Sequence, residues 1–270
     1  MIIAGLLWGD DVILILGGTL ESRKLADFLK SNHYSFLIST VSQYGHSLAR
    51  EVSPNVQRQV LDEHSLEHLC WEKNINTIID ATHPFATNIS LTAIKVASKL
   101  NLNYLRLERE GIKIPVKNSL VHIVANSKEA ASLAPQLGTR ILLTIGSRQL
   151  DYFRELIKEK KVLARVLPEM LSLQKCLELG LQPKQIIAMQ GPFSKEFNKA
   201  LFKEKQVEVV ITKNSGTIGG VDTKVTACLE LNIPVIIIDK PLINYPRIAY
   251  EFCDVMEFLQ EVNNDLSNKS

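Results

Sequence analysis

Short apolar runs alternate with longer segments of helical spacing along most of this chain. Val12–Leu16 is apolar at every position, which is typical of a parallel strand buried on both faces. The next segment, residues 21–30, brings Leu25, Phe28 and Leu29 together on one side of a helix. Because the alternation repeats, we expect right-handed βαβ units and parallel sheets.

The alternation divides the chain into two α/β domains. Further strands are expected at residues 36–41, 56–61, 77–80, 104–107, 121–124, 141–145, 162–164, 185–188, 207–211 and 235–238. Helices are expected at residues 65–73, 86–100, 127–137, 150–159, 168–179, 194–205 and 222–231. Residues 108–120 interrupt the rhythm with Gly111, Pro115 and several charges, so we interpret them as the crossing between domains. The predicted domains are residues 1–112 and residues 113–270.

Composition and charge narrow the class of protein. A net charge of +2 and 46% apolar residues are ordinary for a globular protein, and they provide no broad basic field for nucleic acid. The four cysteines form no CxxC pair, which argues against a zinc site and a disulfide framework. The apolar stretch at residues 1–8 is too short for a signal peptide or a membrane span. We therefore expect a soluble cytoplasmic protein with no metal, nucleic-acid or membrane partner.

A glycine loop follows the first strand and opens the first helix. Gly17 and Gly18 permit a sharp turn close to a phosphate, and the helix start would present N–H groups to that anion. Thr19 could add a hydroxyl donor, and Ser22 is small enough for close packing of helix on strand. The loop lacks the full GxGxxG pattern, so a plain tight turn is the alternative.

The end of the second predicted strand bears on the choice of cofactor. An acidic residue there would bind the ribose of NAD, whereas an arginine would suit NADP. This chain has neither at that point, and Ser39, Thr40 and Ser42 could bind a hydroxyl or a phosphate. An ordinary polar turn is an equal alternative. The choice between NADH and NADPH stays open, and weak discrimination is expected.

The strand at residues 77–80 ends in Asp80, Ala81, Thr82 and His83. This loop follows a parallel strand at its carboxyl end, where open α/β sheets bind ligands. His83 could act as an acid or a base because its ordinary pKa is near neutrality. The alternative is a turn in which Asp80 or Thr82 caps the next helix and His83 is merely exposed.

Four loops of the second half also follow predicted strands. Their candidate residues are Gly146, Ser147 and Arg148, then Arg165, then Gln190 and Gly191, then Lys213, Ser215, Gly216, Gly219, Gly220 and Lys224. The four cations Arg148, Arg165, Lys213 and Lys224 would suit a substrate with several carboxylates, if the sheet order brings their loops to one edge. Ordinary loop glycines with solvated lysines are the alternative.

Six phrases, in this order, resemble the precorrin-6A reductases of cobalamin biosynthesis, including the cobalt-precorrin-6A reductases. They are LGGTLESRKLA, DATHPFA, LLTIGSRQL, ARVLPE, AMQGPFSKEFN and TKNSGTIGGVDTK, and the match runs from Ile13 to about Pro241. GGT alone is common, whereas the ordered set is highly specific. The loop STVSQYG is nearer to the cobalt-substrate members. Asn214 departs from the acidic residue that the family often has, so no proton donor is assigned there.

The resemblance implies two Rossmann-like parallel-sheet domains with a cleft between them. It implies that NADPH or NADH gives hydride to a double bond of the tetrapyrrole, converting precorrin-6A or its cobalt form to precorrin-6B or its cobalt form. Neighbouring enzymes of that pathway are candidate partners. The predicted cofactor site is Gly17, Gly18, Thr19, Glu21, Ser39, Thr40, Thr82, Gly146 and Ser147. The predicted substrate site is Arg165, Gln190, Gly191, Lys213, Ser215, Gly216, Gly219, Gly220 and Lys224. The candidate catalytic residues are Lys213, Ser215 and His83.

Two other functions compete with this interpretation. One is a different NAD(P)-dependent oxidoreductase, such as a short-chain dehydrogenase, but the chain lacks the Tyr-x-x-x-Lys pair of that class. The other is a sensor that binds a nucleotide or tetrapyrrole without turnover. A sensor would usually carry an effector domain, and none is evident in the pattern.

Overall fold

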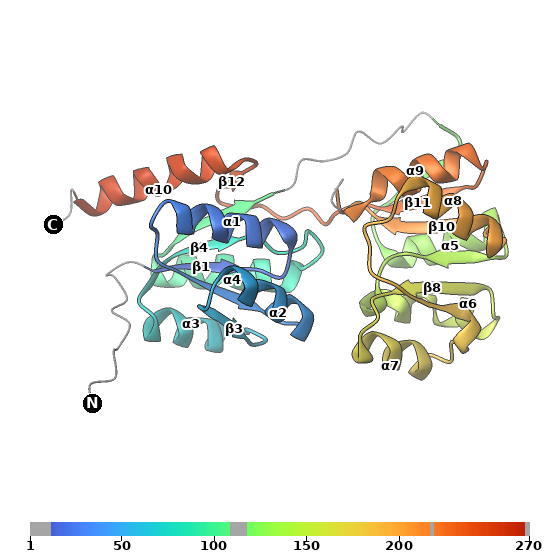
Figure 1. The fold of residues 1–270 in the computed structure, drawn as a ribbon, viewed down its shortest axis with the longest axis horizontal. Coiled ribbons are helices and arrows are strands. Elements are labelled where there is room, and N and C mark those ends of the chain that lie inside the picture. The colour runs from blue at the N-terminus through green and yellow to red at the C-terminus, as the bar shows by residue number, and fades with distance from the viewer. Residues whose placement is uncertain (1–11, 109–117, 217–218, 268–270) are drawn as a thin grey trace. The chain divides into compact units, whose positions relative to one another are not determined.

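The structure, a computed structural model, describes residues 12–108, 118–216 and 219–267. The chain divides into two compact units, residues 1–109 with 242–270 (the first unit) and residues 110–241 (the second unit). Each unit contains one six-stranded sheet in which all paired neighbours are parallel (Figure 1). The α/β class with two parallel sheets, predicted from the alternation, is confirmed.

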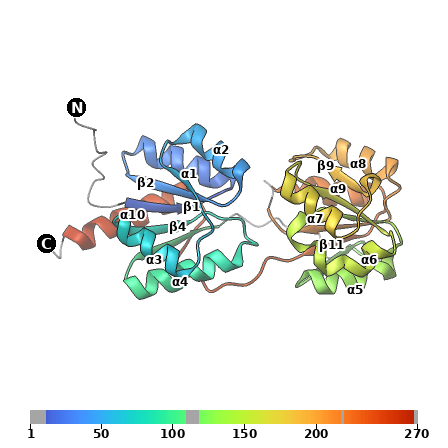
Figure 2. The ribbon, with the colours of Figure 1, turned by 90° about the horizontal axis from the view of Figure 1, so that it is seen from below.

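The first unit has helices on both faces of its sheet (Figure 2). Its strands are β1 (Val12–Leu16), β2 (Phe36–Thr40), β3 (Val56–Arg58), β4 (Ile75–Asp80), β5 (Asn103–Leu107) and β12 (Ile248–Ala249), in the order β3-β2-β1-β4-β5-β12. One apolar core includes side chains of α1 (Leu20–Ser31), α2 (Gln43–Val52) and α10 (Phe252–Ser267). The other includes side chains of α3 (Glu63–Glu72) and α4 (Thr87–Leu100). This strand order is that of the dinucleotide-binding Rossmann fold.

The second unit also has a six-stranded parallel sheet, but here the first strand of the unit lies at one edge, next to the last strand. Its strands are β6 (Val121–Val124), β7 (Ile141–Leu143), β8 (Val162–Val166), β9 (Ile186–Ala188), β10 (Val209–Lys213) and β11 (Val235–Ile238), in the order β6-β11-β10-β7-β8-β9. Helices α8 (Lys195–Glu204) and α9 (Val221–Glu230) share one core with the sheet. The 3-10 helix η1 (Ser147–Phe153) is contacted by three α-helices, which are α5 (Ser127–Leu137), α6 (Arg154–Lys158) and α7 (Met170–Glu178). A short 3-10 turn, η2 (Pro183–Gln185), precedes β9.

Local sequence explains where the first helix begins and ends. The Thr19 side chain caps the start of α1 by accepting a hydrogen bond from the Ser22 N–H at 3.0 Å. Leu25 and Leu29 then bury the inner face of the helix against the sheet. Shortly after the last turn, His33 takes a φ of +61°, a left-handed conformation that the helix cannot continue through. Polar caps and an apolar stripe thus fix the helix that follows the glycine loop.

Both sheets contain a point at which the chain reverses its direction of growth. In the first unit, β2 and β3 extend the sheet on one side of β1, and β4, β5 and β12 extend it on the other. In the second unit, β8 and β9 lie on one side of β7, and β10 and β11 lie on the other. Loops after β1 and β4, and after β7 and β10, therefore leave their sheets at these reversal points. Open α/β sheets bind ligands there, beyond the carboxyl ends of the strands.

The C-terminal segment corrects the predicted domain boundary. The sequence pattern assigned residues 113–270 to one domain, yet residues 242–270 belong to the first unit. Ile248 and Ala249 pair with β5, and the buried side chains of Val255 and Leu259 join the core over α1. The pattern missed this return because β12 has only two residues, too few for a periodic signal.

The remaining differences concern individual elements. Helix α2 was not expected; Ser42 caps it through the Gly45 N–H at 2.9 Å. The strand expected at residues 56–61 ends at Arg58, and the helix expected at 150–159 begins earlier, as the 3-10 turn η1. Residues 109–117 of the predicted crossing and the apolar residues 1–8 lie outside the described residues. None of the described helices is long and apolar enough to cross a membrane.

We expect Leu259→Ala to destabilise the first unit by roughly 2–5 kcal/mol, because it leaves a cavity in the core between α10 and the sheet. The measurement is urea denaturation of the full chain. Leu242→Ala is the control, since Leu242 is fully exposed and should change stability by less than about 0.5 kcal/mol. Equal stabilities of the two variants would mean that α10 is not part of the folded core.

Candidate functional site

The glycine loop of the first unit forms a close turn between β1 and α1. The Gly17 N–H donates to the Ser39 carbonyl at 2.8 Å, and a Cβ at Gly17 would meet the Ile38 Cγ2 at 3.0 Å. Gly18 has a φ of +102°, which L side chains rarely adopt, and a Cβ built there meets no atom within 4 Å. The backbone at Gly18 thus faces open space at the start of a helix. A phosphate fits such a cradle.

Thr19 ties this loop to the one after β4. Its hydroxyl donates to the Ala81 carbonyl at 2.8 Å while accepting from the Ser22 N–H. The Thr19 hydroxyl therefore donates its proton to the protein itself. It does not offer that proton to a phosphate, as the sequence had predicted. Thr19 holds the two loops together, and Glu21 lies half-buried in the first turn of α1.

A buried charged network lies behind the loop after β4. Arg106 of β5 is 1% exposed, and its Nη1 donates to Asp80 Oδ1 at 2.8 Å. The same guanidinium donates from Nη2 to the Thr82 carbonyl at 3.0 Å and from Nε to Glu108 Oε2 at 3.2 Å. Tyr104 donates its hydroxyl proton to Asp80 Oδ2 at 2.9 Å, and burial beside that carboxylate raises the Tyr104 pKa. Desolvation opposes the charge on Arg106, but Asp80 and Glu108 prevail and raise its pKa.

This network rules out the alternative in which Asp80 or Thr82 caps the following helix. Neither Asp80 nor Thr82 caps the following helix: α4 begins at Thr87, and its N-cap residue, Ala86, makes no side-chain cap hydrogen bond. Instead, Asp80 Oδ1 accepts from both the N–H and the hydroxyl of Thr82, at 3.0 and 2.6 Å. Thr82 is thereby fixed at the carboxyl edge beside the glycine loop. The sequence pattern missed Arg106 because a single cation inside an apolar strand gives no sign of its partners.

His83 follows Thr82 on the same loop and is half-buried. Its Nδ1 accepts a hydrogen bond from the Phe85 N–H at 3.2 Å, which favours a tautomer with the proton on Nε2. The ring lies 5.8 Å from that of Phe85. His83 therefore lies on the predicted loop, and the hydrogen bond from the Phe85 N–H fixes the orientation of its ring.

An arginine of the neighbouring strand lies beside the end of β2. Ser39 and Thr40 are buried within the strand, and the Thr40 hydroxyl donates to the Gln57 carbonyl at 3.4 Å. Thr40 pairs in register with Arg58, the last residue of β3, whose guanidinium donates to the Gln43 side chain. Arg58 was missed because it belongs to the neighbouring strand. The end of β2 itself has no arginine, as the sequence shows, but the neighbouring strand brings Arg58 beside it.

In the second unit, the loops after β7 and β10 occupy the reversal point. Gly146 has a φ of +77°, and Gly216 has a φ of +78°. Ser147 begins η1, and its hydroxyl lies 3.0 Å from that of Ser172 in α7. A Cβ at Gly219 would overlap the buried Ser215 side chain, so this part of the loop needs glycine. Gly220, with a φ of +62°, is the N-cap residue of α9.

The four predicted cations lie at the carboxyl edge, but as two pairs. Burial and the nearby Arg148 lower the pKa of Lys213 to about 8. Burial and the nearby Arg165 lower the pKa of Lys224 to about 7. Arg165 is in register with the core residue Ile187 on the face under α8 and α9, whereas Lys213 follows Thr212 and faces the opposite side. The sheet order thus brings the loops of the four cations to one edge, the condition set for their convergence, and there the cations lie as two pairs on opposite faces.

The Arg165–Lys224 pair has a polar setting without a carboxylate in hydrogen-bond contact among the described residues. Arg165 donates to Asn198 Oδ1 at 2.9 Å, and its guanidinium lies 4.5 Å from the centre of the Phe193 ring. Phe193 follows Gln190 and Gly191 in the loop after β9. The buried Thr212 hydroxyl, on the same face of the sheet, has no hydrogen-bond partner among the described residues. Two buried cations and an unsatisfied hydroxyl suit an anionic ligand.

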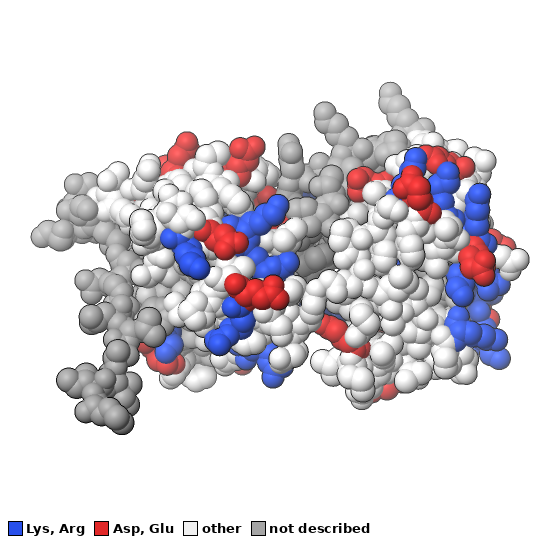
Figure 3. All heavy atoms as spheres, in the orientation of Figure 1, with Lys and Arg blue, Asp and Glu red and all other residues white. Residues whose placement is uncertain are grey.

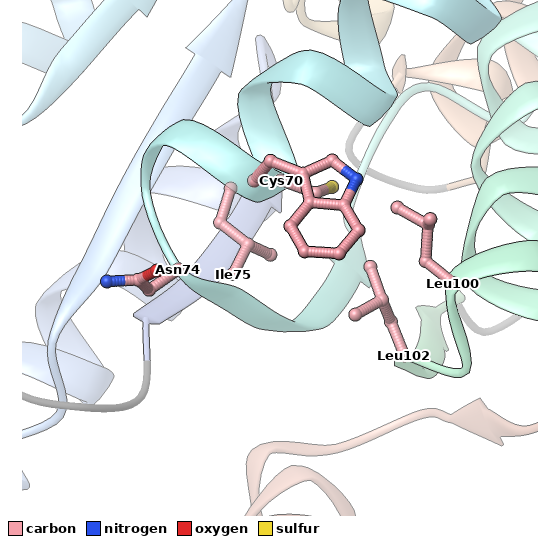
Figure 4. A pocket seen from close by; sticks show the side chains of 6 residues that line it. Cys70, Asn74, Ile75, Leu100 and Leu102 are labelled. Atoms are coloured by element: carbon pink, nitrogen blue, oxygen red, sulfur yellow. The ribbon is translucent and has the colours of Figure 1, made fainter.

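A small pocket lies away from these loops. It has a volume of about 220 Å³ and is lined by Cys70, Trp71, Asn74, Ile75, Leu100 and Leu102 (Figure 4). Ile75 is the first residue of β4, so the pocket lies at the amino edge of the first sheet.

Metal-binding groups of three or more His, Cys, Asp or Glu are absent from the described part of the chain. The face in Figure 3 shows charges of both signs in small groups.

Comparisons with known proteins agree on one family. The family described as "Precorrin-6x reductase CbiJ/CobK" matches residues 12–260. The cobalt-precorrin-6A reductase of Priestia megaterium is 35% identical over 92% of this chain and 98% of its own length. That of Methanocaldococcus jannaschii is 36% identical over 93% and 98%. A solved CobK precorrin-6A reductase has the same fold, with a TM-score of 0.74 at 22% identity, over 93% of this chain and 97% of that one.

We expect Arg106→Met to lower the free energy of unfolding by roughly 3–5 kcal/mol, because it leaves the buried Asp80 carboxylate without its ion-pair partner. Lys95→Met is the control, since it removes the exposed Lys95–Glu63 pair and should cost less than about 1 kcal/mol. Urea denaturation measures both. A loss for Arg106→Met no larger than the control would refute a structural role for the network.

The buried Lys224 gives a pH-dependent prediction. Its pKa is about 7 when folded and 10.5 ordinarily, so between these values the unfolded chain binds more protons. The free energy of unfolding should therefore rise as pH rises from about 7 to 10. Lys224→Met removes this contribution, and at pH 7 we expect it to be more stable than the wild type by roughly 1–4 kcal/mol. Urea denaturation at several pH values measures the difference; parallel pH curves for the two proteins would contradict it.

Proposed function

This chain belongs to the precorrin-6x reductase CbiJ/CobK family, and from that membership we propose that it reduces a double bond of the precorrin-6A macrocycle, in the metal-free or the cobalt form, with NADPH or NADH. The product would be precorrin-6B or its cobalt form. The observation that carries the proposal is the glycine cradle at the reversal point of a Rossmann-ordered sheet. The names of the two relatives compared above favour the cobalt substrate.

The residues of the first unit fit a dinucleotide. Gly17 and Gly18 leave room for the pyrophosphate at the start of α1, and Thr82 is held beside them by Asp80 and Arg106. A nicotinamide supplies hydride when bound. Glu21, Ser39 and Thr40 are further proposed cofactor-binding residues of the first unit, and Gly146 and Ser147 are those proposed in the second. Arg58 and Gln43 are candidates to contact a 2′-phosphate, which would favour NADPH.

The second unit fits the chemistry of the substrate. A tetrapyrrole of this pathway is a flat ring with carboxylate arms, and the two cation pairs suit those arms. Arg165 and Lys224 would bind one arm, and Lys213 another. Around them the loops supply the rest of the proposed substrate site: Gln190, Gly191, Ser215, Gly216, Gly219 and Gly220. A carboxylate bound beside Lys224 would also offset the desolvation that lowers its pKa.

Reduction of a carbon–carbon double bond needs a proton as well as a hydride. Lys213, Ser215 and His83 are the proposed catalytic candidates. The pKa of Lys213, lowered to about 8 by burial and by Arg148, lets its ammonium release a proton near neutral pH. His83 can hold a proton at Nε2, because its Nδ1 accepts from the Phe85 N–H.

An anaerobic assay tests the reaction. Precorrin-6A and cobalt-precorrin-6A would each be mixed with the protein and either NADPH or NADH, following loss of the reduced cofactor's absorbance at 340 nm. We expect cofactor oxidation that depends on the tetrapyrrole. A protein that binds the tetrapyrrole without oxidising either cofactor would instead be a sensor, the alternative function.

We expect Gly18→Ala to weaken NAD(P)H binding by about tenfold or more, because a Cβ there would occupy the space proposed for the pyrophosphate. Fluorescence titration with NADPH and NADH measures the dissociation constant. Gly180→Ala is a matched control: Gly180 also has a positive φ, of +88°, and open space around it, but lies after α7, away from the glycine loop. If both variants bind the cofactor equally well, the glycine loop is not the pyrophosphate site.

A further inference from the structure

Exposed apolar side chains gather at one end of the second sheet. Leu167 follows the last residue of β8, Met189 follows the last residue of β9, and Met170 and Leu171 form the first turn of α7. Met170 is 81% exposed and Leu171 is 79% exposed. We call these four residues the apolar rim. Large apolar side chains that gather on a surface commonly mark a binding site.

Hydrogen bonds fix the rim beside the loops of the reversal point. The Met189 N–H donates to the Val166 carbonyl at 3.0 Å, which joins the ends of β8 and β9. The Ser172 hydroxyl, adjacent to Leu171, lies 3.0 Å from the Ser147 hydroxyl. Ser147 is followed by the exposed Arg148, which lies close enough to Lys213 to lower its pKa. The apolar rim therefore borders a cationic region at the same edge.

The fold does not need Met170 and Leu171 for its core. Helix α7 buries Ser172 and Cys176 against the unit, and both apolar residues point away from that face. Methionine adapts its shape to flat ligands because its side chain is unbranched and polarizable. An apolar surface next to cations matches a molecule that has an apolar face and anionic edges.

We propose that the apolar rim is the surface against which one face of the tetrapyrrole ring lies, with its carboxylate arms directed to Arg148 and Lys213. This inference rests on the proposed function and adds to it the residues that would recognise the ring itself. None of the four rim residues carries a charge, so the rim would contribute affinity for the ring and leave orientation to the cations.

The test replaces Met170 and Leu171 together by glutamine, giving Met170→Gln/Leu171→Gln. The control is Leu177→Gln, on the same helix and also exposed, but near the opposite end. Anaerobic ultrafiltration without NAD(P)H would measure retention of cobalt-precorrin-6A by each full-length protein. We expect retention by the double variant to weaken about 10- to 100-fold, because two buried apolar contacts are lost. The control should retain the tetrapyrrole as the wild type does, and all three proteins should bind NADPH equally.

Three results would overturn the proposal. Equal retention by the double variant and the control, with normal turnover by the wild type, would remove the rim and leave the proposed reaction intact. Failure of the wild type to retain the tetrapyrrole would remove the rim as its binding surface. A lower sedimentation coefficient for the double variant alone would show that the rim joins two copies of the chain. Conversely, strong retention by a wild type that oxidises no cofactor would refute the reaction, while the comparison of variants would still test the rim.

Discussion

The ion pair between Arg106 and Asp80 is the interaction on which the carboxyl edge of the first unit depends. Asp80 ends β4, so its carboxylate is buried at the point where the next loop begins, and Arg106 of β5 neutralises it. The same guanidinium bonds the Thr82 carbonyl and hydroxyl, which fixes the loop beside the glycine turn. The returning C-terminal segment supports the arginine from the other side: the Arg106 N–H donates to the Arg247 carbonyl, and the Tyr245 ring lies 5.3 Å from the guanidinium carbon. A contact between two strands thus links the edge of the sheet to the last part of the chain.

The buried cations of the second unit lie beside like charges, whereas that of the first unit lies beside opposite charges. In the first unit, each charge of the network faces an opposite charge, so burial does not remove ionisation from Arg106. In the second unit, Lys224 and Arg165 lie near one another, and burial lowers the pKa of both, to about 7 and about 10. Like charges brought together in a desolvated place lower stability unless an anion joins them. The buried charges of the first edge are thus neutralised by one another, whereas the described residues give Lys224 and Arg165 no carboxylate in hydrogen-bond contact.

Local patterns were sufficient for most of the fold and for the positions of the loops. Alternating apolar runs and helical stripes revealed both sheets, because strands buried on both faces leave a strong signal. The same patterns could not reveal β12, whose two residues pair with β5 only after the chain returns from the second unit. For the site, glycines after strands identified Gly18 and Gly146, since positive φ is a local demand. The sequence pattern could not reveal the roles of Arg106 and Arg58, because these come from contacts with neighbouring strands. The split of the cations into two pairs follows from strand alternation, which puts Lys213 and Arg165 on opposite faces of the sheet.

The two sheets follow one plan, yet their reversal points are built from different chemistry, and this asymmetry is itself informative. A pyrophosphate needs close backbone and helix N–H groups, which the Gly17–Gly18 turn offers; the nearby Arg23 donates from Nη1 to the Thr19 carbonyl at 3.3 Å. A ring with several carboxylate arms would need separated cations and an apolar surface, and the carboxyl edge of the second sheet has both, in Lys213, Arg165 and the exposed first turn of α7. If the two edges were interchangeable, both would show the same donors. The difference agrees with the proposed function, in which the proposed hydride donor and the proposed acceptor differ in shape and charge.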